Sequence, residues 1–73
     1  SGLGKLVVIR HSEKYLSVYG HNRDIVVKER QKVVLGQKIA EIGNTDADQP
    51  NLHFEIRRFG KPVDPMQFLP GRP

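Results

Sequence analysis

The sequence predicts an all-β fold with a single short helical turn near its C-terminus. Val and Ile supply 13 of the 27 hydrophobic residues, whereas Ala supplies only 2. This bias favours strands, because β-branched side chains suit a pleated sheet and are restricted in a helix. Turn-forming residues also recur at short intervals and divide the chain into segments of strand length.

The first half of the chain contains three predicted strands. Residues 6–10 form an apolar run that ends at a polar turn, and residues 25–28 form another after a predicted turn at residues 21–24. Between them, residues 15–21 alternate with the period of two that a half-buried strand shows. The two sides of that strand differ in polarity, with Leu16 and Val18 on one side and Tyr15, Ser17, Tyr19 and His21 on the other.

The second half contains two predicted strands and the helical turn. Residues 37–42 form one strand, which a polar loop at residues 44–50 separates from the next strand at residues 52–58. Asp64 followed by Pro65 is a typical helix start, with Asp as the N-cap and Pro at the first helical position. The alternation is clearest in the second strand, whose apolar side is Leu52, Phe54 and Ile56 and whose polar side is Asn51, His53, Glu55 and Arg57.

Composition excludes several classes of protein. The chain has 73 residues and no cysteine, so its core is small and disulfides, thiolate metal sites and cysteine nucleophiles are excluded. Its 12 Lys and Arg outnumber 8 Asp and Glu but are spread along the chain, unlike the clustered charge of nucleic-acid binders, and we expect no nucleic-acid partner. No apolar run approaches the roughly 20 residues that span a bilayer.

Three histidines are the residues that suggest metal or base chemistry, namely His11, His21 and His53. A zinc hydrolase needs three protein ligands and an open position for water, and neither His-Glu-x-x-His nor its inverse occurs. No serine lies in a Gly-x-Ser-x-Gly context. Catalysis by this chain alone is therefore not expected. His21 and His53 each lie on the polar side of an alternating strand, so neighbouring strands would bring them to one groove; an ordinary polar sheet face is the alternative.

Five sequence blocks resemble the LytM (lysostaphin-like) zinc metallopeptidase family. The blocks read LVVIRH, YLSVYGHN, GQKIAEIGNT, LHFEIR and GKPVDP, and they cover residues 6–11, 15–22, 36–45, 52–57 and 60–65. The resemblance extends over nearly the whole chain and implies antiparallel sheets of the duplicated-hybrid, barrel-sandwich-like type. Within the family, the chain is most similar to members that activate murein hydrolases.

Carried over residue by residue, the resemblance implies a degenerate active site. Active members have a His-x-x-x-Asp motif with two zinc ligands, a His-x-His motif whose second His is the third ligand, and a further catalytic His upstream. His53 matches the third ligand and His21 the upstream His, whereas Asn51 replaces the first His of His-x-His and His-x-x-x-Asp is absent. An amide is not a general base near neutral pH. We expect no catalytic residue, no cofactor and no metal, with His53 a vestigial ligand.

The same resemblance implies a regulatory function. It predicts a non-catalytic domain that binds and activates an N-acetylmuramyl-L-alanine amidase, a peptidoglycan hydrolase, during cell separation. The partner would occupy the degenerate groove, and peptidoglycan is a further expected partner. The implied location is the periplasm of the bacterial cell envelope, with an outer-membrane lipoprotein as the parent chain. The residues expected to line the groove are Tyr19, His21, Asn51, His53 and Arg57.

Two alternatives stay open. The first is an active zinc endopeptidase of the same family, truncated here, that cleaves peptidoglycan cross-links; Asn51 argues against it because it lies inside the chain. The second is a carrier module of the biotinyl or lipoyl type, which residues 32–40 resemble. The Asp-Lys-Ala or Met-Lys-Met setting of the modified lysine is absent.

The resemblance also implies that residues 1–73 form the C-terminal portion of one LytM domain, without its N-terminal strands. Such a portion has open sheet edges and uncovered apolar surface, which invite pairing with another chain. We therefore expect a non-covalent complement, either a missing piece of the domain or a second copy in a homo-oligomer or swapped dimer.

Overall fold

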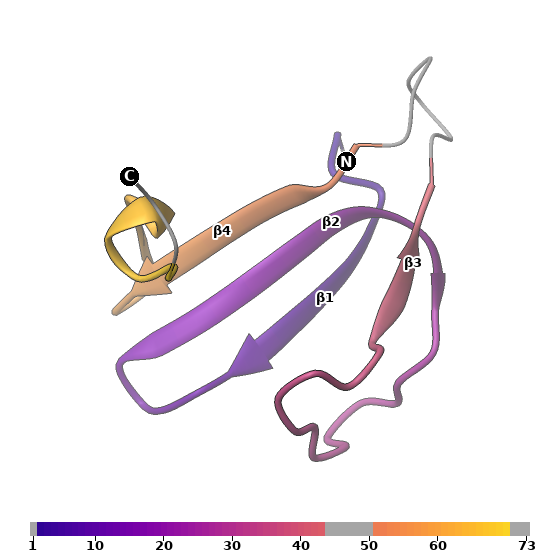
Figure 1. Ribbon diagram of the computed structural model, residues 1–73, viewed down its shortest axis with the longest axis horizontal. Helices are drawn as coiled ribbons and strands as arrows, with labels where there is room; N and C mark the ends of the chain where they lie inside the picture. Colours follow the sequence, from indigo (N-terminus) through magenta and orange to yellow (C-terminus); the bar gives the residue numbers. More distant parts are fainter. Residues whose placement is uncertain (1, 44–50, 71–73) are drawn as a thin grey trace.

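The computed structural model describes residues 2–43 and 51–70, which form one antiparallel sheet and a single 3₁₀ turn (Figure 1). The strands follow the order β1-β2-β4-β5, and β3 pairs with β2 outside this path. The predicted all-β class is confirmed, and the open sheet is consistent with the predicted type. The elements are β1 (Lys5–Arg10), β2 (Tyr15–Ile25), β3 (Ala40–Ile42), β4 (His53–Arg58), β5 (Lys61–Val63) and η1 (Pro65–Gln67).

The long strand β2 is the centre of the sheet and pairs with three other strands. β1 runs antiparallel to its first half on one side, and β4 runs antiparallel to the same half on the other. Asn22 pairs with Lys5 of β1 and also with Ile42 of β3, so β3 continues along the edge that β4 occupies. β2 curves at the point along its length where its partner strand changes from β4 to β3 (Figure 1).

A bulge at His21 replaces the turn that the sequence predicted at residues 21–24. The β1–β2 register passes from Val7↔Tyr19 to Lys5↔Asn22, which places one extra residue in β2. His21 takes a left-handed conformation with φ of 64°, and its N–H donates to the Leu3 carbonyl at 2.7 Å. The turn prediction was wrong because these backbone bonds carry the strand on to Ile25.

Asn22 fixes the bulge through its buried side chain. Its Nδ2 donates to the carbonyl of Lys5 at 3.0 Å and to that of Tyr19 at 2.9 Å, and only 4% of the residue is exposed. An Asn in a polar cluster predicts a turn from composition, but here its amide ties two backbone segments of a continuing sheet.

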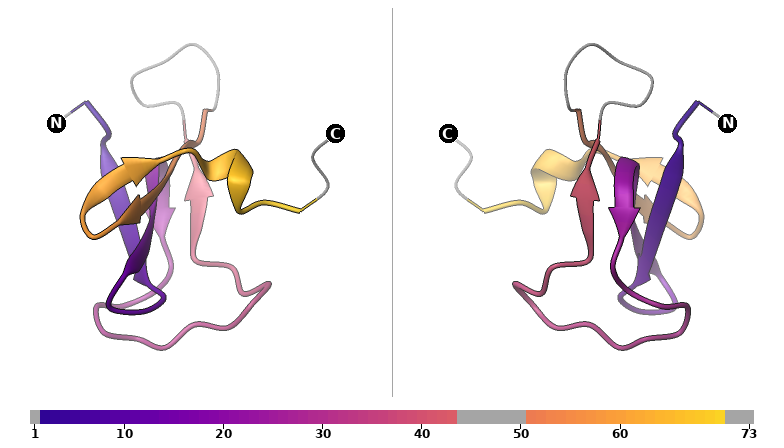
Figure 2. Two further views of the ribbon diagram at one scale, coloured as in Figure 1. Left: turned by 90° about the vertical axis from the view of Figure 1, so that its left-hand side faces the viewer. Right: turned by 90° about the vertical axis from the view of Figure 1, so that its right-hand side faces the viewer.

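Two other predicted strands had wrong boundaries, and one strand was not predicted. Of residues 25–28 only Ile25 is in a strand, and of residues 37–42 only Ala40–Ile42 are. Residues 26–39 instead make an open excursion away from the strands (Figure 2). β5 was missed because Phe59 and Gly60, both with positive φ (49° and 80°), form the tight turn of a hairpin. The predicted loop at residues 44–50 lies outside the described residues.

The predicted helix start is confirmed as the start of a 3₁₀ turn. The Asp64 side chain accepts from the Met66 N–H at 3.0 Å, and Pro65 is the first residue of η1. Phe68 then packs on Tyr15 with ring centroids 5.4 Å apart, which holds the C-terminal segment against the start of β2.

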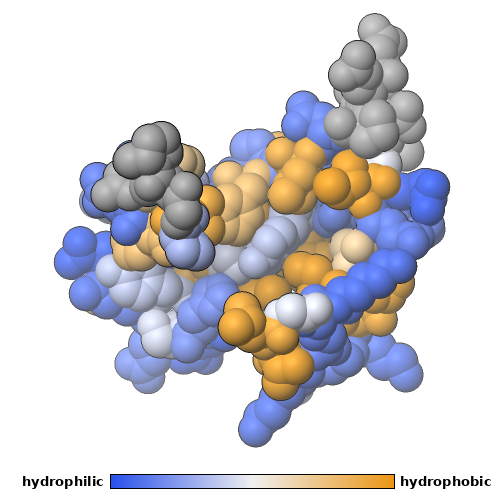
Figure 3. All heavy atoms as spheres, viewed as in Figure 1, coloured by the Kyte–Doolittle hydropathy of each residue, from blue (hydrophilic) through white to orange (hydrophobic). Residues whose placement is uncertain are grey.

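Little of the apolar surface of the described residues is buried. Val7 and Val18 are the buried hydrophobic residues, while Leu6, Val8, Leu52, Phe68 and Leu69 are between 39% and 54% exposed. Hydrophobic side chains gather around a hollow between the strands and residues 26–39 (Figure 3). The hollow has a volume of about 1390 Å³, and its walls include Val7, Ile9, Ile39 and Ile42. The described part of the chain contains no helix long and apolar enough to cross a membrane.

Candidate functional site

The pairing of β2 with β4 assigns side chains to two faces of the sheet. Residues opposite one another in an antiparallel pair lie on the same face. Tyr19 pairs with Phe54 and Ser17 with Ile56, and these four residues define what we call the aromatic face. Gly20 pairs with His53 and Val18 with Glu55 on the other side. We call this side the histidine face, which is defined by Leu16, Val18, His21, His53, Glu55 and Arg57.

The bulge decides the face on which His21 lies. In an uninterrupted strand, Tyr19 and His21 would lie on one face, as the alternation predicted. The extra residue instead turns His21 toward His53, and the two imidazole rings meet edge to face with centroids 6.0 Å apart. The structure therefore brings His21 and His53 together on one face of the sheet.

Tyr19 is a correction to the predicted site. It packs against Phe54 with ring centroids 5.3 Å apart, on the face opposite His53, because the bulge comes after Tyr19 and leaves it in the original alternation. Asn51 is exposed and lies just before β4, separated from its first residue by Leu52. Arg57 lies on the histidine face as expected.

His53, Glu55 and Arg57 form a hydrogen-bonded chain along β4. The Glu55 carboxylate uses both of its oxygens: Oε1 accepts from Arg57 Nε at 2.7 Å, and Oε2 lies 2.6 Å from His53 Nε2. The hydrogen bond from Arg57, and then that from His53, lower the pKa of Glu55 below the ordinary value of a glutamate. Glu55 is therefore ionised at neutral pH, and its charge is already compensated.

The described residues do not fit a zinc site by themselves. No three His, Cys, Asp or Glu side chains within residues 2–43 and 51–70 come together as a ligand set. The Nε2 atom of His53 is engaged by Glu55, and His21 is the one other histidine beside it. The arrangement is instead a polar surface of two imidazoles and one arginine, in which His53 and Arg57 both contact the Glu55 carboxylate.

A second polar chain, which the sequence did not predict, lies on the aromatic face. His11 Nε2 is 2.7 Å from Ser17 Oγ, and Ser17 Oγ donates to the Tyr19 hydroxyl at 3.0 Å. Ser17 is only 3% exposed. The alternation did place Ser17 and Tyr19 on one side, but nothing in the sequence indicated that His11 would reach across the hairpin to join them.

Comparison with known proteins shows the family to which the chain belongs. Residues 1–65 match the model of Peptidase family M23, and the chain belongs to that family, which confirms the resemblance to LytM-type domains. It is 61% identical over 71 residues to the lipoprotein NlpD/LppB homolog of Pseudomonas aeruginosa, covering 97% of this chain and 24% of that protein. No solved structure shows significant similarity to it.

Other relatives carry related names. The murein hydrolase activator NlpD of Escherichia coli is 49% identical, covering 97% of this chain and 19% of that protein. The lipoprotein NlpD of Yersinia enterocolitica is 48% identical, covering 97% of this chain and 73% of that sequence. The chain thus spans a quarter or less of the first two relatives. The predicted similarity to activator members of the family is confirmed.

Proposed function

We propose that this chain is a non-catalytic domain that binds and activates a peptidoglycan-cleaving amidase through its histidine face. The observation that carries the proposal is the name of the relatives, murein hydrolase activator, at 49% identity over 97% of the chain. The proposed contact residues are His21, Asn51, His53 and Arg57, with Tyr19 removed from the predicted set because it faces the other way.

The chemistry of this face supports a binding role more than a catalytic one. A general base works best with a pKa near the operating pH, whereas the pKa of Glu55 is lowered by its bonds to Arg57 and His53. Asn51 stands where active family members have a catalytic His, and an amide does not take up a proton at neutral pH. His21 and His53 keep hydrogen-bonding capacity without a third ligand beside them among the described residues.

Activation by binding needs a surface that prefers one state of the hydrolase. A domain that binds the open form of its partner more tightly than the closed form shifts the population toward the open form. The histidine face offers donors and acceptors at fixed positions on two paired strands, which suits the docking of an inhibitory segment of the amidase.

The names of the relatives also support a cell-envelope location. They include lipoproteins of Pseudomonas aeruginosa and Yersinia enterocolitica and the outer membrane antigenic lipoprotein B of Haemophilus influenzae. We place this chain in the periplasm, as part of a lipoprotein, where amidase and peptidoglycan are both accessible.

We further propose that the 73 residues are one portion of a larger domain. The support is the hollow of about 1390 Å³ and the many large hydrophobic residues that are at least 39% exposed. Additional strands of the longer protein would fill this hollow. A longer version of the protein is then expected to unfold at a markedly higher temperature than residues 1–73; equal melting temperatures would reject the proposal.

An activation assay with the full-length protein tests the function. Purified amidase and labelled peptidoglycan are incubated with wild type, His21→Asn or Asn51→Ala. Asn is chosen at position 21 because it tolerates the left-handed conformation there. Each variant is expected to need about tenfold more protein for half-maximal activation, as for a residue central to an interface. Arg58→Gln, on the opposite face, is the control.

Two results would overturn the proposal. Unchanged activation by both variants would move the contact surface away from the histidine face. Release of peptide fragments by the protein without amidase would instead favour the alternative of an active endopeptidase.

A further inference from the structure

One row of side chains lies at the end of the histidine face that is remote from His21. Arg10 of β1 is in register with Leu16 of β2, and Leu16 is in register with Arg57 of β4. The three side chains therefore share the face. Neighbouring strands are about 4.8 Å apart, so the backbones of the two arginines are separated by roughly 10 Å across Leu16. We call this set the arginine row.

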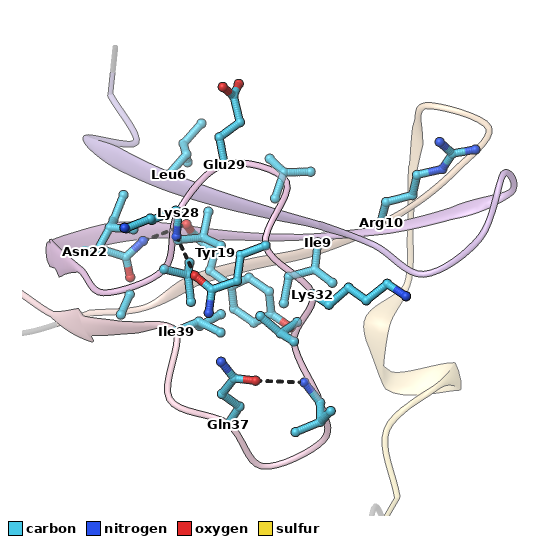
Figure 4. A pocket seen from close by; sticks show the side chains of 18 of the residues that line it. Leu6, Ile9, Arg10, Tyr19, Asn22, Lys28, Glu29, Lys32, Gln37 and Ile39 are labelled. Atoms are coloured by element: carbon cyan, nitrogen blue, oxygen red, sulfur yellow. Dashed lines mark hydrogen bonds between the residues drawn. The ribbon is translucent and has the colours of Figure 1, made fainter.

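The arginine row carries uncompensated positive charge. Glu55 is the single acidic residue in β1, in β4 and in the part of β2 that pairs with these two strands. Its carboxylate is already satisfied by Arg57 Nε and His53 Nε2. Arg10 is exposed and lies at the rim of the hollow, on the same side of β1 as Leu6 and opposite Ile9 (Figure 4). Within residues 2–43 and 51–70, the row thus combines one guanidinium without an ion-pair partner and a second that is paired at one nitrogen.

Arg57 is held ready for a second acceptor. A guanidinium has five N–H donors in a planar fork, and Glu55 uses the Nε–H of Arg57. The remaining four donors belong to the terminal nitrogens, which can bind a carboxylate in bidentate fashion. Because Glu55 and His53 already fix this side chain, less conformational entropy is lost when it binds an acidic group.

The surroundings of the row indicate a polypeptide that is both acidic and apolar. Leu6 and Val8 lie next to it on the same face and are 40% and 54% exposed. In an extended polyproline II segment each residue advances about 3.1 Å and side chains three positions apart point to the same side, so acidic residues at these positions are roughly 9 Å apart. This spacing matches the separation of the two arginines, and the exposed apolar side chains beside the row can contact the residues between the two acids.

We propose that the arginine row binds an extended acidic segment of the partner amidase, with Arg10 and Arg57 each binding a carboxylate. The proposal rests on the proposed function, because it gives the chemistry of the partner at the same face. It assigns a role to Arg10 and Leu16, which neither the family resemblance nor the histidine pair had singled out.

Direct binding of the full-length protein to the purified amidase tests this role. Arg10→Gln is compared with Arg58→Gln, which removes the same charge from the opposite face, and with Arg10→Lys, which keeps the charge. At about 50 mM salt, Arg10→Gln is expected to raise the dissociation constant about tenfold, as for a lost hydrogen bond to a charged group. Arg58→Gln should change it less than about twofold, and Arg10→Lys should lie between them.

The salt dependence is a second readout. At about 300 mM salt the wild-type complex is expected to weaken, because exposed charges are screened over a shorter distance. The dissociation constant of the Arg10→Gln complex should rise less between the two salt concentrations than that of the wild-type complex. Circular dichroism confirms that the variants retain the sheet.

The outcomes separate this inference from the proposed function. If His21→Asn impairs activation while Arg10→Gln and Arg58→Gln bind the amidase equally well, the function stands and the arginine row has no role. If Arg10→Gln lowers co-sedimentation with purified peptidoglycan and leaves amidase binding unchanged, the occupant is the cell-wall polymer and the inference is wrong. If neither His21→Asn nor Arg10→Gln has an effect, both proposals fall.

Discussion

The two faces of the β2–β4 sheet have the same backbone and carry two different polar networks. On the histidine face, the side chains of His53, Glu55 and Arg57 are 36%, 18% and 37% exposed. On the aromatic face, Ser17 is 3% exposed and links His11 to Tyr19 beside Phe54. A partner can reach the first network directly, whereas the second is centred on a buried serine and contributes to the fold.

One inserted residue produces this difference. The bulge turns His21 to the histidine face and leaves Tyr19 on the aromatic face. Because strands have a period of two, one extra residue moves every later side chain to the opposite face. Substitutions at the bulge should therefore affect both faces, and substitutions on one face should affect that face alone.

The largest effect on stability is expected from Gly43→Ala, because Gly43 packs directly against the bulge. Gly43 donates its N–H to the His21 carbonyl at 3.1 Å, and a Cβ at this position would lie 2.9 Å from the Cα of Arg23. Overpacking of this kind costs about 3 kcal/mol of the free energy of unfolding, which urea denaturation measures. The His21–His53 contact should also be lost, visible as a change in imidazole NMR shifts.

Gly2→Ala is the matched control, because nothing lies within 4 Å of a Cβ built at Gly2. It should change the free energy of unfolding by less than about 0.5 kcal/mol. Equal stabilities of the two variants would show that the bulge does not depend on the close approach of Gly43 to β2.

Asn22→Ala should have the second-largest effect. It removes the two hydrogen bonds that Nδ2 donates to the carbonyls of Lys5 and Tyr19 and leaves buried acceptors behind. At about 1 kcal/mol for each bond, the free energy of unfolding should fall by about 2 kcal/mol. Gln31→Ala removes an exposed amide in the loop and is expected to be near neutral; a loss as large as that of Asn22→Ala would contradict this account.

The bulge also explains how far the sequence predicted the site. Alternation placed His53, Glu55 and Arg57 on one face correctly, because β4 is regular from its first residue to its last. The same rule misplaced His21, which it put on the side of Tyr19, because alternation cannot detect the extra residue that the bulge inserts after Tyr19. His21 and His53 were brought together for a reason that the alternation did not contain.

Strand boundaries followed a similar logic. β1 and β4 matched the predicted apolar and alternating runs within a residue, since each pairs along its whole length with β2. The apolar residues of 26–39, such as Val34 and Leu35, are 73% and 103% exposed, and local composition could not show that they have no strand to pair with. Tertiary pairing decided those boundaries.

Tyr19→Phe should have a smaller effect, confined to the aromatic face. The variant keeps the packing on Phe54 and removes the hydroxyl that accepts from Ser17 Oγ. The free energy of unfolding should fall by about 1 kcal/mol, the typical value of one hydrogen bond. Amidase activation should be unchanged at saturating protein, and a loss of activation would mean that the two faces are coupled.

The smallest effect is expected from Glu55→Gln, which acts through pH on the histidine face alone. The pKa of Glu55 is lowered in the folded protein by Arg57 and His53, so its ion pairs stabilise the fold above the pKa of an unfolded glutamate and are lost as the pH falls through the folded pKa. The free energy of unfolding of the wild type should therefore decrease on acidification below about pH 5. Glu55→Gln should flatten this decrease.

Glu41→Gln is the control. Lys38 and Arg23 lower the pKa of Glu41 in the same direction, but its side chain is 37% exposed against 18% for Glu55. Solvent screens the more exposed pair more strongly, so Glu41→Gln should flatten the acid limb less; the reverse order would mean that the Glu55 chain is not held on the sheet.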